Sequence, residues 1–135
     1  MRERVVVYVE REDGLLVFDH RDDSEAGTQV PAGGIDAGED LADAVRREVM
    51  EETGVRIEAA PTPLGVHEHL DGLGQPTRSH FFRVDAPEGL PRSWEHVVGG
   101  EGIDAGMTFS CRFESTPELW AHQAVFLRIS EARPD

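Results

Sequence analysis

Three glutamates near the middle of the chain have the spacing of a shared functional site. Glu48, Glu51 and Glu52 stand at positions i, i+3 and i+4, so on a helix they lie on one face. Their oxygen atoms are hard ligands of the kind that Mg²⁺ and Mn²⁺ prefer, whereas Zn²⁺ favours nitrogen and sulfur. The spacing therefore predicts a divalent cation held by the carboxylates of a single helix.

A helix that would carry these glutamates is predicted over residues 40–53. Apolar side chains recur there at helical spacing, and Glu39 and Asp40 stand where negative charge favours a helix start. Gly54 follows as a C-terminal stop. The recurring apolar residues are Leu41, Ala44, Val45 and Val49.

The predicted helix turns two of the glutamates toward its apolar side. At about 100° per residue, Glu48 and Glu52 fall near the middle of the apolar arc and Glu51 at its edge. Burying an ionised carboxylate costs on the order of several kcal/mol unless it is compensated, and a divalent cation would compensate both. The alternative is an ordinary amphipathic helix whose glutamates pair with Arg46 and Arg47.

The segment around this helix resembles the signature of the Nudix family, Gly-x5-Glu-x7-Arg-Glu-(apolar)-x-Glu-Glu-x-Gly-(apolar). Nine fixed positions over 23 residues all carry the expected residue type. They are Gly33, Glu39, Arg47, Glu48, Val49, Glu51, Glu52, Gly54 and Val55. The resemblance is sharp over residues 31–55, and elsewhere it is limited to the order of the expected strands.

This resemblance implies both a fold and an activity. The fold is of the α/β class, an α/β/α sandwich with a mixed β-sheet in which the signature forms a loop–helix–loop. The activity is Mg²⁺-dependent hydrolysis of a diphosphate bond in a nucleoside diphosphate linked to a further group X, with Mn²⁺ as an alternative metal. Such cations neutralise phosphates and lower the pKa of a bound water.

The resemblance also implies ligands for the metal. Glu48 and Glu52 are expected to be the main ligands and Glu51 a third. The backbone carbonyl of Gly33 often joins this set in similar proteins. These residues are therefore expected to form the metal site.

Further roles fall to an arginine and to a distant loop. Arg47 is expected to be structural, reaching Glu39 at the start of the loop and Asp43 one turn earlier in the helix. The general base is either a signature glutamate or an acid in the glycine-rich loop, for which Glu101 and Asp104 are the candidates. We count Glu101 with the three helix glutamates as catalytic; the alternative is that both loop acids are merely solvated.

Strands are expected on both sides of the helix. They are Val5–Glu10 and Leu15–Asp19, which form a hairpin, a short strand at Thr28–Val30, and then Leu64–Leu70, Ser79–Val84, Trp94–Val98 and Met107–Glu114. Residues 31–34 are expected to turn into the signature loop. Thr116 and Pro117 are expected to start a closing helix over Leu119–Ile129.

Length and composition exclude several classes of protein. The 135 residues suit a single domain, residues 1–135, and no apolar run approaches the roughly 20 residues that span a bilayer. The N-terminus lacks the pattern of a signal peptide, and the single Cys111, flanked by Phe109 and Phe113, suits a core thiol in a reducing cytoplasm. We therefore expect a cytoplasmic protein without a disulfide.

The negative charge of the chain limits the classes of partner that it can bind. The net charge is −14 and the chain contains no lysine, so chemistry that needs a P-loop or Schiff-base lysine is excluded. Strong negative charge disfavours binding to DNA or to an anionic membrane. A small-molecule nucleoside diphosphate derivative remains compatible, because a metal can screen its phosphates locally.

Other side chains are weaker candidates for binding. His67 and His69 share a strand face and His80 lies on the next strand, so the three could bind Zn²⁺ or line a substrate rim, and the rim is favoured. Candidate phosphate contacts are Arg78, Arg83 and Arg112.

Two other functions remain open at this stage. One is a nucleotide-binding or regulatory module that keeps the Nudix fold without catalysis. The other is isomerisation of an isoprenyl diphosphate, which would need a catalytic cysteine, and Cys111 is the only one. The sequence leaves the group X unassigned among oxidised nucleoside triphosphates, dinucleoside polyphosphates, ADP-ribose, NADH, nucleotide sugars and capped RNA. A monomer and a homodimer are both open.

Overall fold

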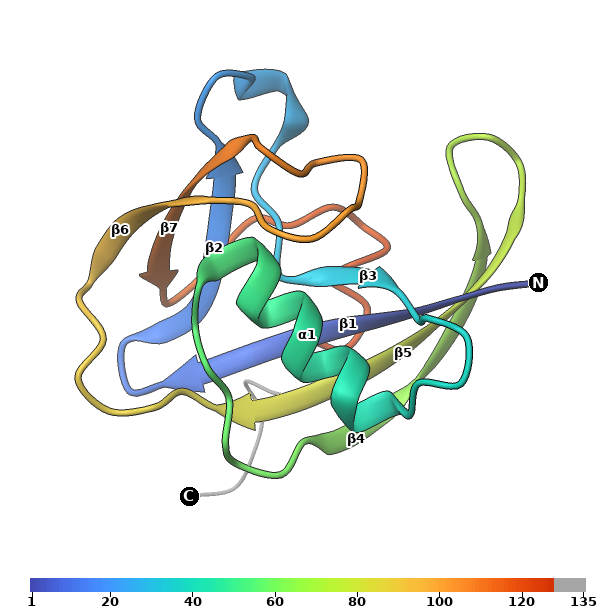
Figure 1. The fold of residues 1–135 in the computed structure, drawn as a ribbon, viewed down its shortest axis with the longest axis horizontal. Helices are drawn as coiled ribbons and strands as arrows, with labels where there is room; N and C mark the ends of the chain where they lie inside the picture. The colour runs from blue at the N-terminus through green and yellow to red at the C-terminus, as the bar shows by residue number, and fades with distance from the viewer. Residues whose placement is uncertain (128–135) are drawn as a thin grey trace.

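Seven strands form one mixed β-sheet in the computed structural model, which describes residues 1–127 of the chain (Figure 1). The strands are β1 (Arg2–Arg11), β2 (Gly14–His20), β3 (Ala32–Gly34), β4 (Thr62–Leu70), β5 (Pro76–Asp85), β6 (Ser93–Val97) and β7 (Thr108–Glu114). Their order is β4-β5-β1-β2-β7-β6, and β3 pairs with β1 outside this path. β1 and β5 are parallel and the other paired strands antiparallel.

The long strand β1 changes its partner along its length. Its C-terminal end pairs with β2 at Arg11↔Gly14, as the hairpin prediction requires. Its N-terminal half pairs with β3, where Val5 lies opposite Gly33. β2 thus diverges from β1, and β3 brings the first signature glycine beside the start of the chain (Figure 1).

The prediction for the third strand was wrong in position. Residues 28–30 contribute only an isolated bridge between Phe18 and Gln29, and strand pairing occurs at residues 32–34, where a turn was expected. Gly33 and Gly34 have low strand propensity, which is why the sequence favours a turn. Pairing with the long β1 overrides that local preference.

The helix α1 (Leu41–Thr53) confirms the predicted helix; it ends at the predicted residue and begins one residue later than predicted. The Asp40 carboxylate accepts a hydrogen bond from the Asp43 N–H at 2.8 Å and so caps the first turn. Gly54 takes a left-handed conformation, with φ of 77°, and its N–H donates to the Met50 carbonyl at 2.9 Å. The buried residues of α1 are Ala44, Val45, Glu48, Val49 and Thr53.

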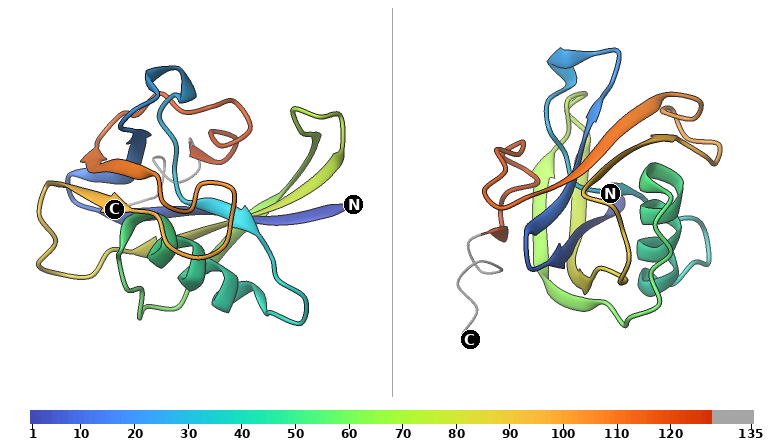
Figure 2. Two further views of the ribbon diagram at one scale, coloured as in Figure 1. Left: turned by 45° about the horizontal axis from the view of Figure 1, so that its top comes forward. Right: turned by 90° about the vertical axis from the view of Figure 1, so that its left-hand side faces the viewer.

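The sheet separates two apolar clusters, one on each face. Val5, Val7 and Val9 of β1 point to the face covered by α1, while Val6 and Tyr8 point to the other face. The chain after β7 covers that second face, so helix, sheet and C-terminal segment form three layers (Figure 2). This arrangement confirms the predicted mixed-sheet α/β fold.

The predicted closing helix is wrong over residues 119–126, which form turns and bends, and its last two residues lie outside the described part of the chain. Contacts with the sheet account for the difference. The Tyr8 hydroxyl donates to the Gln123 carbonyl at 2.5 Å, and the Gln123 side-chain oxygen accepts from the Val30 N–H at 2.9 Å. These long-range bonds engage groups that a regular helix would orient differently.

The helices within residues 1–127 are all too short or too polar to cross a bilayer.

Replacing Tyr8 by Phe tests how firmly the C-terminal segment is attached to the sheet. The change removes the buried donor to the Gln123 carbonyl and leaves the ring in place. We expect a loss of about 1–3 kcal/mol in the free energy of unfolding, measured by urea titration, because a buried carbonyl loses its partner. An unchanged free energy would show that this contact does not hold the layer.

Candidate functional site

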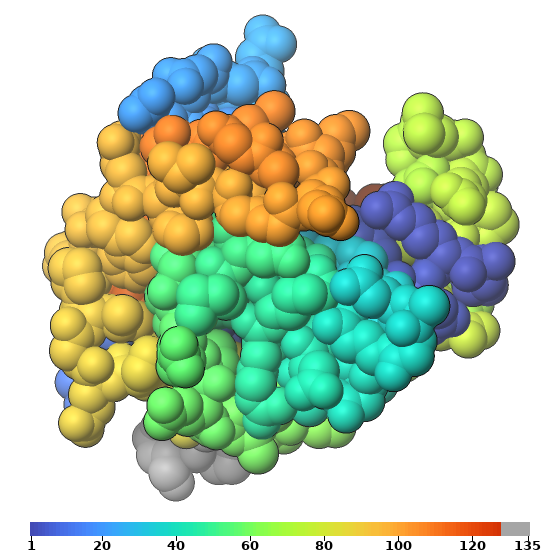
Figure 3. Space-filling model, viewed as in Figure 1, coloured from blue at the N-terminus to red at the C-terminus, as the bar shows by residue number. Residues whose placement is uncertain are grey.

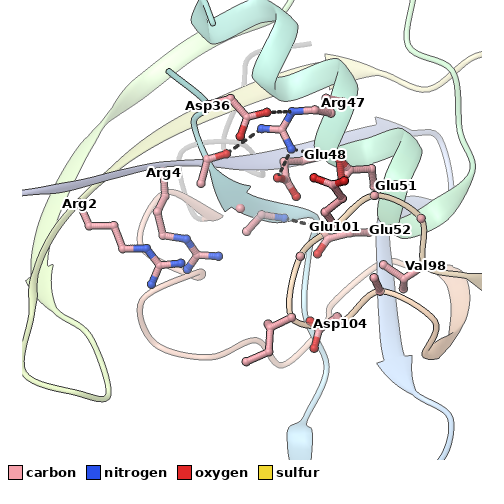
Figure 4. Close-up of a pocket in the computed structure, with 18 residues that line it drawn as sticks. Arg2, Arg4, Asp36, Arg47, Glu48, Glu51, Glu52, Val98, Glu101 and Asp104 are labelled. Carbon is pink, nitrogen blue, oxygen red and sulfur yellow. Dashed lines mark hydrogen bonds and ion pairs between the residues drawn. The ribbon is translucent and has the colours of Figure 1, made fainter. Parts of the chain in front are cut away.

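A cavity of about 550 Å³ opens between α1, β3, the N-terminal end of β1 and the loop that follows β6 (Figure 4). All six residues proposed from the sequence for metal binding or base catalysis line it: Gly33, Glu48, Glu51, Glu52, Glu101 and Asp104. The fold therefore brings the helix carboxylates and the loop acids to one hollow.

Arg47 ties the signature loop to the helix. Its Nε and Nη2 donate to the two Glu39 oxygens at 2.8 and 2.9 Å, and Nη2 also donates to the Gly34 carbonyl at 2.7 Å. Nη1 donates to one oxygen of Glu48 at 2.7 Å and one of Glu51 at 3.1 Å. The expected contact with Glu39 is present, so Arg47 fixes the loop and orients two of the three site glutamates.

The other expected partner of Arg47, Asp43, has a different role. Its carboxylate pairs with Arg46 at 3.6 Å. The prediction placed Asp43 one turn before Arg47, but the Arg47 guanidinium is directed to the signature loop instead (Figure 4).

Glu48 and Glu52 are carboxylates whose burial is incompletely compensated. Burial raises the pKa of Glu48, and Arg47 offsets this only in part. Burial raises the pKa of Glu52 well above its ordinary value, and the neighbouring Glu48 charge raises it further. The Ala32 N–H donates to Glu52 at 2.9 Å and works in the opposite direction. A cation between these groups would stabilise both ionised carboxylates.

Two glycines allow the backbone to approach the carboxylates. A Cβ on Gly33 would lie 2.2 Å from the Glu48 carboxyl carbon, so strand β3 can pass beneath Glu48 only with glycine there. A Cβ on Gly100 would lie 2.3 Å from a Glu51 oxygen, and Gly100 also has φ of +76°, which favours glycine. The backbone can therefore approach the site glutamates closely on two sides.

The loop after β6 is attached to the C-terminal end of α1, and Figure 3 shows it packed directly against the helix. The Gly99 N–H donates to the Glu51 carbonyl at 2.9 Å, and His96 Nε2 lies 3.0 Å from the same oxygen. Trp94 Nε1 donates to the Thr53 carbonyl at 2.8 Å. These contacts use carbonyls that have no partner inside the helix, and they place the loop acids over the cavity.

Arg2 and Arg4 of β1 are functional candidates that the sequence analysis missed. Their guanidinium groups lie close together, across the cavity from Glu48 and Glu52 (Figure 4). The only signal in the sequence is their i, i+2 spacing at the start of a strand, which places them on one face. The two arginines line the cavity only because β3 and α1 lie beside β1 in the fold.

The arginines proposed from the sequence as phosphate contacts do not line this cavity. Arg78 pairs with Glu3 and Glu68, and Arg83 pairs with Glu10 and Asp85. Arg112 pairs with Asp19 and Glu114. The structure thus places these three side chains outside the cavity, where each is engaged by carboxylates on its own or a neighbouring strand.

The proposed group of His67, His69 and His80 is wrong in one member. His80 Nε2 lies 2.6 Å from a Glu3 oxygen, so that ring is turned toward β1. His122, from the C-terminal segment, takes its place, and its Nδ1 lies 3.1 Å from His67 Nε2. No local pattern connects His122 with β4, because the contact spans 55 positions.

The helix site offers the kind of ligands that a hard divalent cation needs. Its donors are carboxylate oxygens, two of them on buried or half-buried glutamates whose charge is poorly compensated. Within residues 1–127, no three acidic, histidine or cysteine side chains are placed to hold a metal as they stand. Arg47 takes one oxygen from Glu48 and one from Glu51, so a cation would compete with these bonds.

Comparison with known proteins identifies a family for most of the chain. The family model described as the NUDIX domain matches residues 1–124. An RNA pyrophosphohydrolase from Rhizobium meliloti is 36% identical over 105 residues, which cover 62% of this chain and 63% of that protein. An NAD-capped RNA hydrolase, NudC, from Klebsiella pneumoniae is 40% identical over 53 residues, covering 39% of this chain and 21% of that protein. The chain thus spans less than two thirds of these relatives.

Solved structures share the fold at lower identity. A MutT NUDIX hydrolase from Burkholderia pseudomallei has a TM-score of 0.68 at 22% identity and covers 94% of this chain and 95% of its own. A UDP-X diphosphatase has a TM-score of 0.67 at 13% identity, with 96% of this chain and 59% of its own covered. These likenesses support the architecture of the sheet and helix.

The two adjacent signature glycines provide a matched pair of variants. Gly33→Ala places a methyl group against the Glu48 carboxylate, whereas nothing lies within 4 Å of a Cβ on Gly34. We expect Gly33→Ala to weaken Mn²⁺ binding at least about tenfold in a titration followed by electron paramagnetic resonance, because carboxylate misorientation reduces metal affinity. Gly34→Ala is the control and should bind Mn²⁺ like the wild type. Equal affinity in both variants would contradict the close approach at Gly33.

The raised pKa of Glu52 predicts how the stability of the metal-free protein depends on pH. The folded protein binds the proton of the Glu52 carboxyl group more tightly than the unfolded chain does. The free energy of unfolding therefore falls as pH rises from the ordinary carboxyl range through the raised pKa. In EDTA, Glu52→Gln should therefore have a higher Tm than the wild type at about pH 8, and the difference should shrink toward about pH 5.

Calorimetry or thermal circular dichroism would measure both Tm values, with exposed Glu88→Gln as the control. A Tm difference for Glu52→Gln that does not change with pH would contradict the burial of an ionisable Glu52.

Proposed function

The chain belongs to the Nudix family, and from this premise we propose that it hydrolyses the diphosphate bond of a nucleoside diphosphate linked to a group X. The cofactor proposed is Mg²⁺, with Mn²⁺ as a substitute. The observation that carries the proposal is a pair of poorly compensated carboxylates, the buried Glu48 and the half-buried Glu52, at the wall of a cavity. This arrangement would only destabilise a helix whose role is purely structural.

In this proposal Glu48, Glu51, Glu52 and the backbone carbonyl of Gly33 hold the cation. When bound, the cation supplies charge neutralisation for the diphosphate and acidifies a water. Arg47 keeps the glutamates oriented through one oxygen of Glu48 and one of Glu51. The carboxylates of this site can thus be positioned before substrate arrives, which is the main protein contribution to phosphoryl-type transfer.

Glu101 is our candidate for the general base. It comes from the loop fixed to α1 through the Glu51 carbonyl, and it lines the cavity beside the helix carboxylates. The Glu101 carboxylate would take a proton from the attacking water as the new P–O bond forms at one phosphorus, while the bridging P–O bond breaks and the other phosphate leaves with the bridging oxygen. Asp104 lines the same cavity and is the second candidate for this role.

The relatives support the class of substrate but leave the group X open. Their names describe an RNA pyrophosphohydrolase, an NAD-capped RNA hydrolase and a UDP-X diphosphatase. Each name refers to a diphosphate group, through the words pyrophosphohydrolase and diphosphatase or through NAD, whose two nucleotides are joined by a diphosphate. The net charge of −14 disfavours a long RNA, so we propose a small-molecule nucleoside diphosphate derivative. We place the reaction in the cytoplasm, where a lone buried thiol such as Cys111 stays reduced.

The two competing functions are weaker on specific grounds. A non-catalytic binding module has no need for all three site glutamates, and this chain retains them beside the cavity. Isomerisation would need a reactive thiol, but Cys111 is buried in the core next to β2, and burial raises its pKa to about 12.

A hydrolysis panel tests the proposed function. Nucleoside triphosphates, ADP-ribose, dinucleotides, nucleotide sugars and dinucleoside polyphosphates are incubated with Mg²⁺ or Mn²⁺, and the products are identified. Glu52→Gln should lower turnover by at least about 100-fold with its fold intact, because a metal ligand is lost. Exposed Glu88→Gln is the matched control and should keep full activity. Tight nucleotide binding without hydrolysis under either metal would favour the binding module.

The identity of the base is tested by two loop variants. Glu101→Gln should lower kcat by about 10²–10⁴-fold, because the proton acceptor is lost. Asp104→Asn should have a smaller effect. If Asp104→Asn lowers kcat by this amount and Glu101→Gln does not, the base is Asp104. If neither variant lowers kcat, a helix glutamate acts as the base.

A further inference from the structure

A second cavity, of about 460 Å³, lies beside the first and is not used by the helix carboxylates. Its wall combines side chains of β1, β4 and β5 with the C-terminal segment. The residues that matter here are Arg4, His69, Ser79, Trp120 and His122. Arg4 also lines the first cavity, so the two hollows meet at its side chain.

Arg4 is a candidate for binding an anion. Its Nε is buried and has no hydrogen-bond partner within the described residues 1–127. An unsatisfied buried N–H costs about 1–3 kcal/mol, which a phosphate oxygen would offset. Neighbouring Arg2 adds positive charge at the same place (Figure 4). The Glu48 and Glu52 charges on one side and Asp71 on the other favour the charged form of Arg4, whose pKa burial lowers.

The second cavity presents aromatic rings to a ligand. The His69 and His122 rings are stacked, with centroids 4.0 Å apart and planes at 13°. His67 supports them from outside the cavity, through its contact with His122 at 3.1 Å. Burial lowers the pKa of His67, and so do the neighbouring histidines, which favours the neutral imidazole. Trp120 lines the same cavity with about half of its surface exposed (52%).

The three histidines are not arranged as a metal centre. Their rings lie roughly parallel, at 13–29° to one another, so their nitrogen lone pairs do not converge on one point. The His67 and His122 nitrogens are instead hydrogen-bonded to each other. Flat faces and ring N–H groups beside an exposed tryptophan suit a planar heteroaromatic ligand better than an ion.

We propose that the second cavity binds the nucleobase of the substrate, against Trp120 and the His69–His122 pair, and that Arg4 binds the phosphate nearest the nucleoside. This inference rests on the proposed function, because it assigns the two ends of the same substrate. The diphosphate then lies between the helix carboxylates and Arg4, and the base continues past Arg4 into the second cavity. The structure thereby makes the base, and not only the diphosphate, a determinant of specificity.

Binding of nucleoside monophosphates in EDTA tests the proposal without hydrolysis or metal. Isothermal calorimetry would titrate AMP, GMP, CMP and UMP into the wild-type protein, with ribose 5-phosphate as the ligand that lacks a base. We expect at least one nucleotide to bind about tenfold or more tightly than ribose 5-phosphate, because stacking on aromatic side chains contributes about 1–3 kcal/mol per base.

Variants separate the two parts of the site. Trp120→Ala and His122→Ala should each weaken nucleotide binding about 5–100-fold and leave ribose 5-phosphate binding unchanged. Arg4→Gln should weaken both ligands and leave binding of the unphosphorylated nucleoside unchanged. The control is Leu73→Ala, in the exposed β4–β5 connection outside the cavity lining, which should bind like the wild type. Circular dichroism checks that every variant is folded.

The results distinguish this proposal from the proposed function. Glu52→Gln should keep nucleotide binding even though it loses hydrolysis. If no nucleotide binds better than ribose 5-phosphate, or if Trp120→Ala and His122→Ala both bind like the wild type, the second cavity does not hold the base, whatever the hydrolysis panel shows. Should Arg4→Gln fail to fold, the Trp120 and His122 variants still decide the outcome.

Discussion

Two carboxylates on the core side of α1, the buried Glu48 and the half-buried Glu52, determine how the elements around them are arranged. Desolvation of each ionised carboxylate costs free energy that ordinary core packing does not offset. The surroundings limit this cost only partly, through Arg47 on Glu48 and the Ala32 N–H on Glu52. What remains is a strong local preference for positive charge at the wall of the cavity, and this preference is the physical basis for the metal binding that we propose.

The features around these carboxylates follow from that constraint. β3 must pass under Glu48 without a side chain, so Gly33 stands opposite Val5 of β1. The loop after β6 must approach Glu51 from the other side, and Gly100 allows it to do so. The same loop is bonded to the end of α1 through the Glu51 carbonyl. Helix, strand and loop therefore hold one another in the geometry that the site needs.

The sequence predicts the helix and its carboxylates well because their information is local. Helical periodicity, the negative charge of Asp40 at the helix start and the Gly54 stop lie within one segment, and the structure has all three. The closing helix could not be excluded from the sequence, since its residues have adequate helix propensity. Its replacement by turns depends on bonds from Tyr8 and Val30, which lie far away along the chain.

The missed residues share the same physical cause. Arg4 reaches the site only because β1 lies between β3 and β5 in the sheet. Trp120 and His122 reach the second cavity only because the C-terminal segment packs back on β1 and β4. Local patterns do not encode such proximity, so the end of the site that we propose for the diphosphate is predictable from the sequence and the end proposed for the base is not.

Anomalous diffraction from crystals grown with Mn²⁺ would show whether the helix carboxylates hold a divalent cation. We expect an anomalous peak among Glu48, Glu51 and Glu52, with at least one of the Arg47 bonds to Glu48 and Glu51 broken or lengthened. A peak elsewhere in a well-ordered crystal, or none at these carboxylates at saturating Mn²⁺, would contradict it.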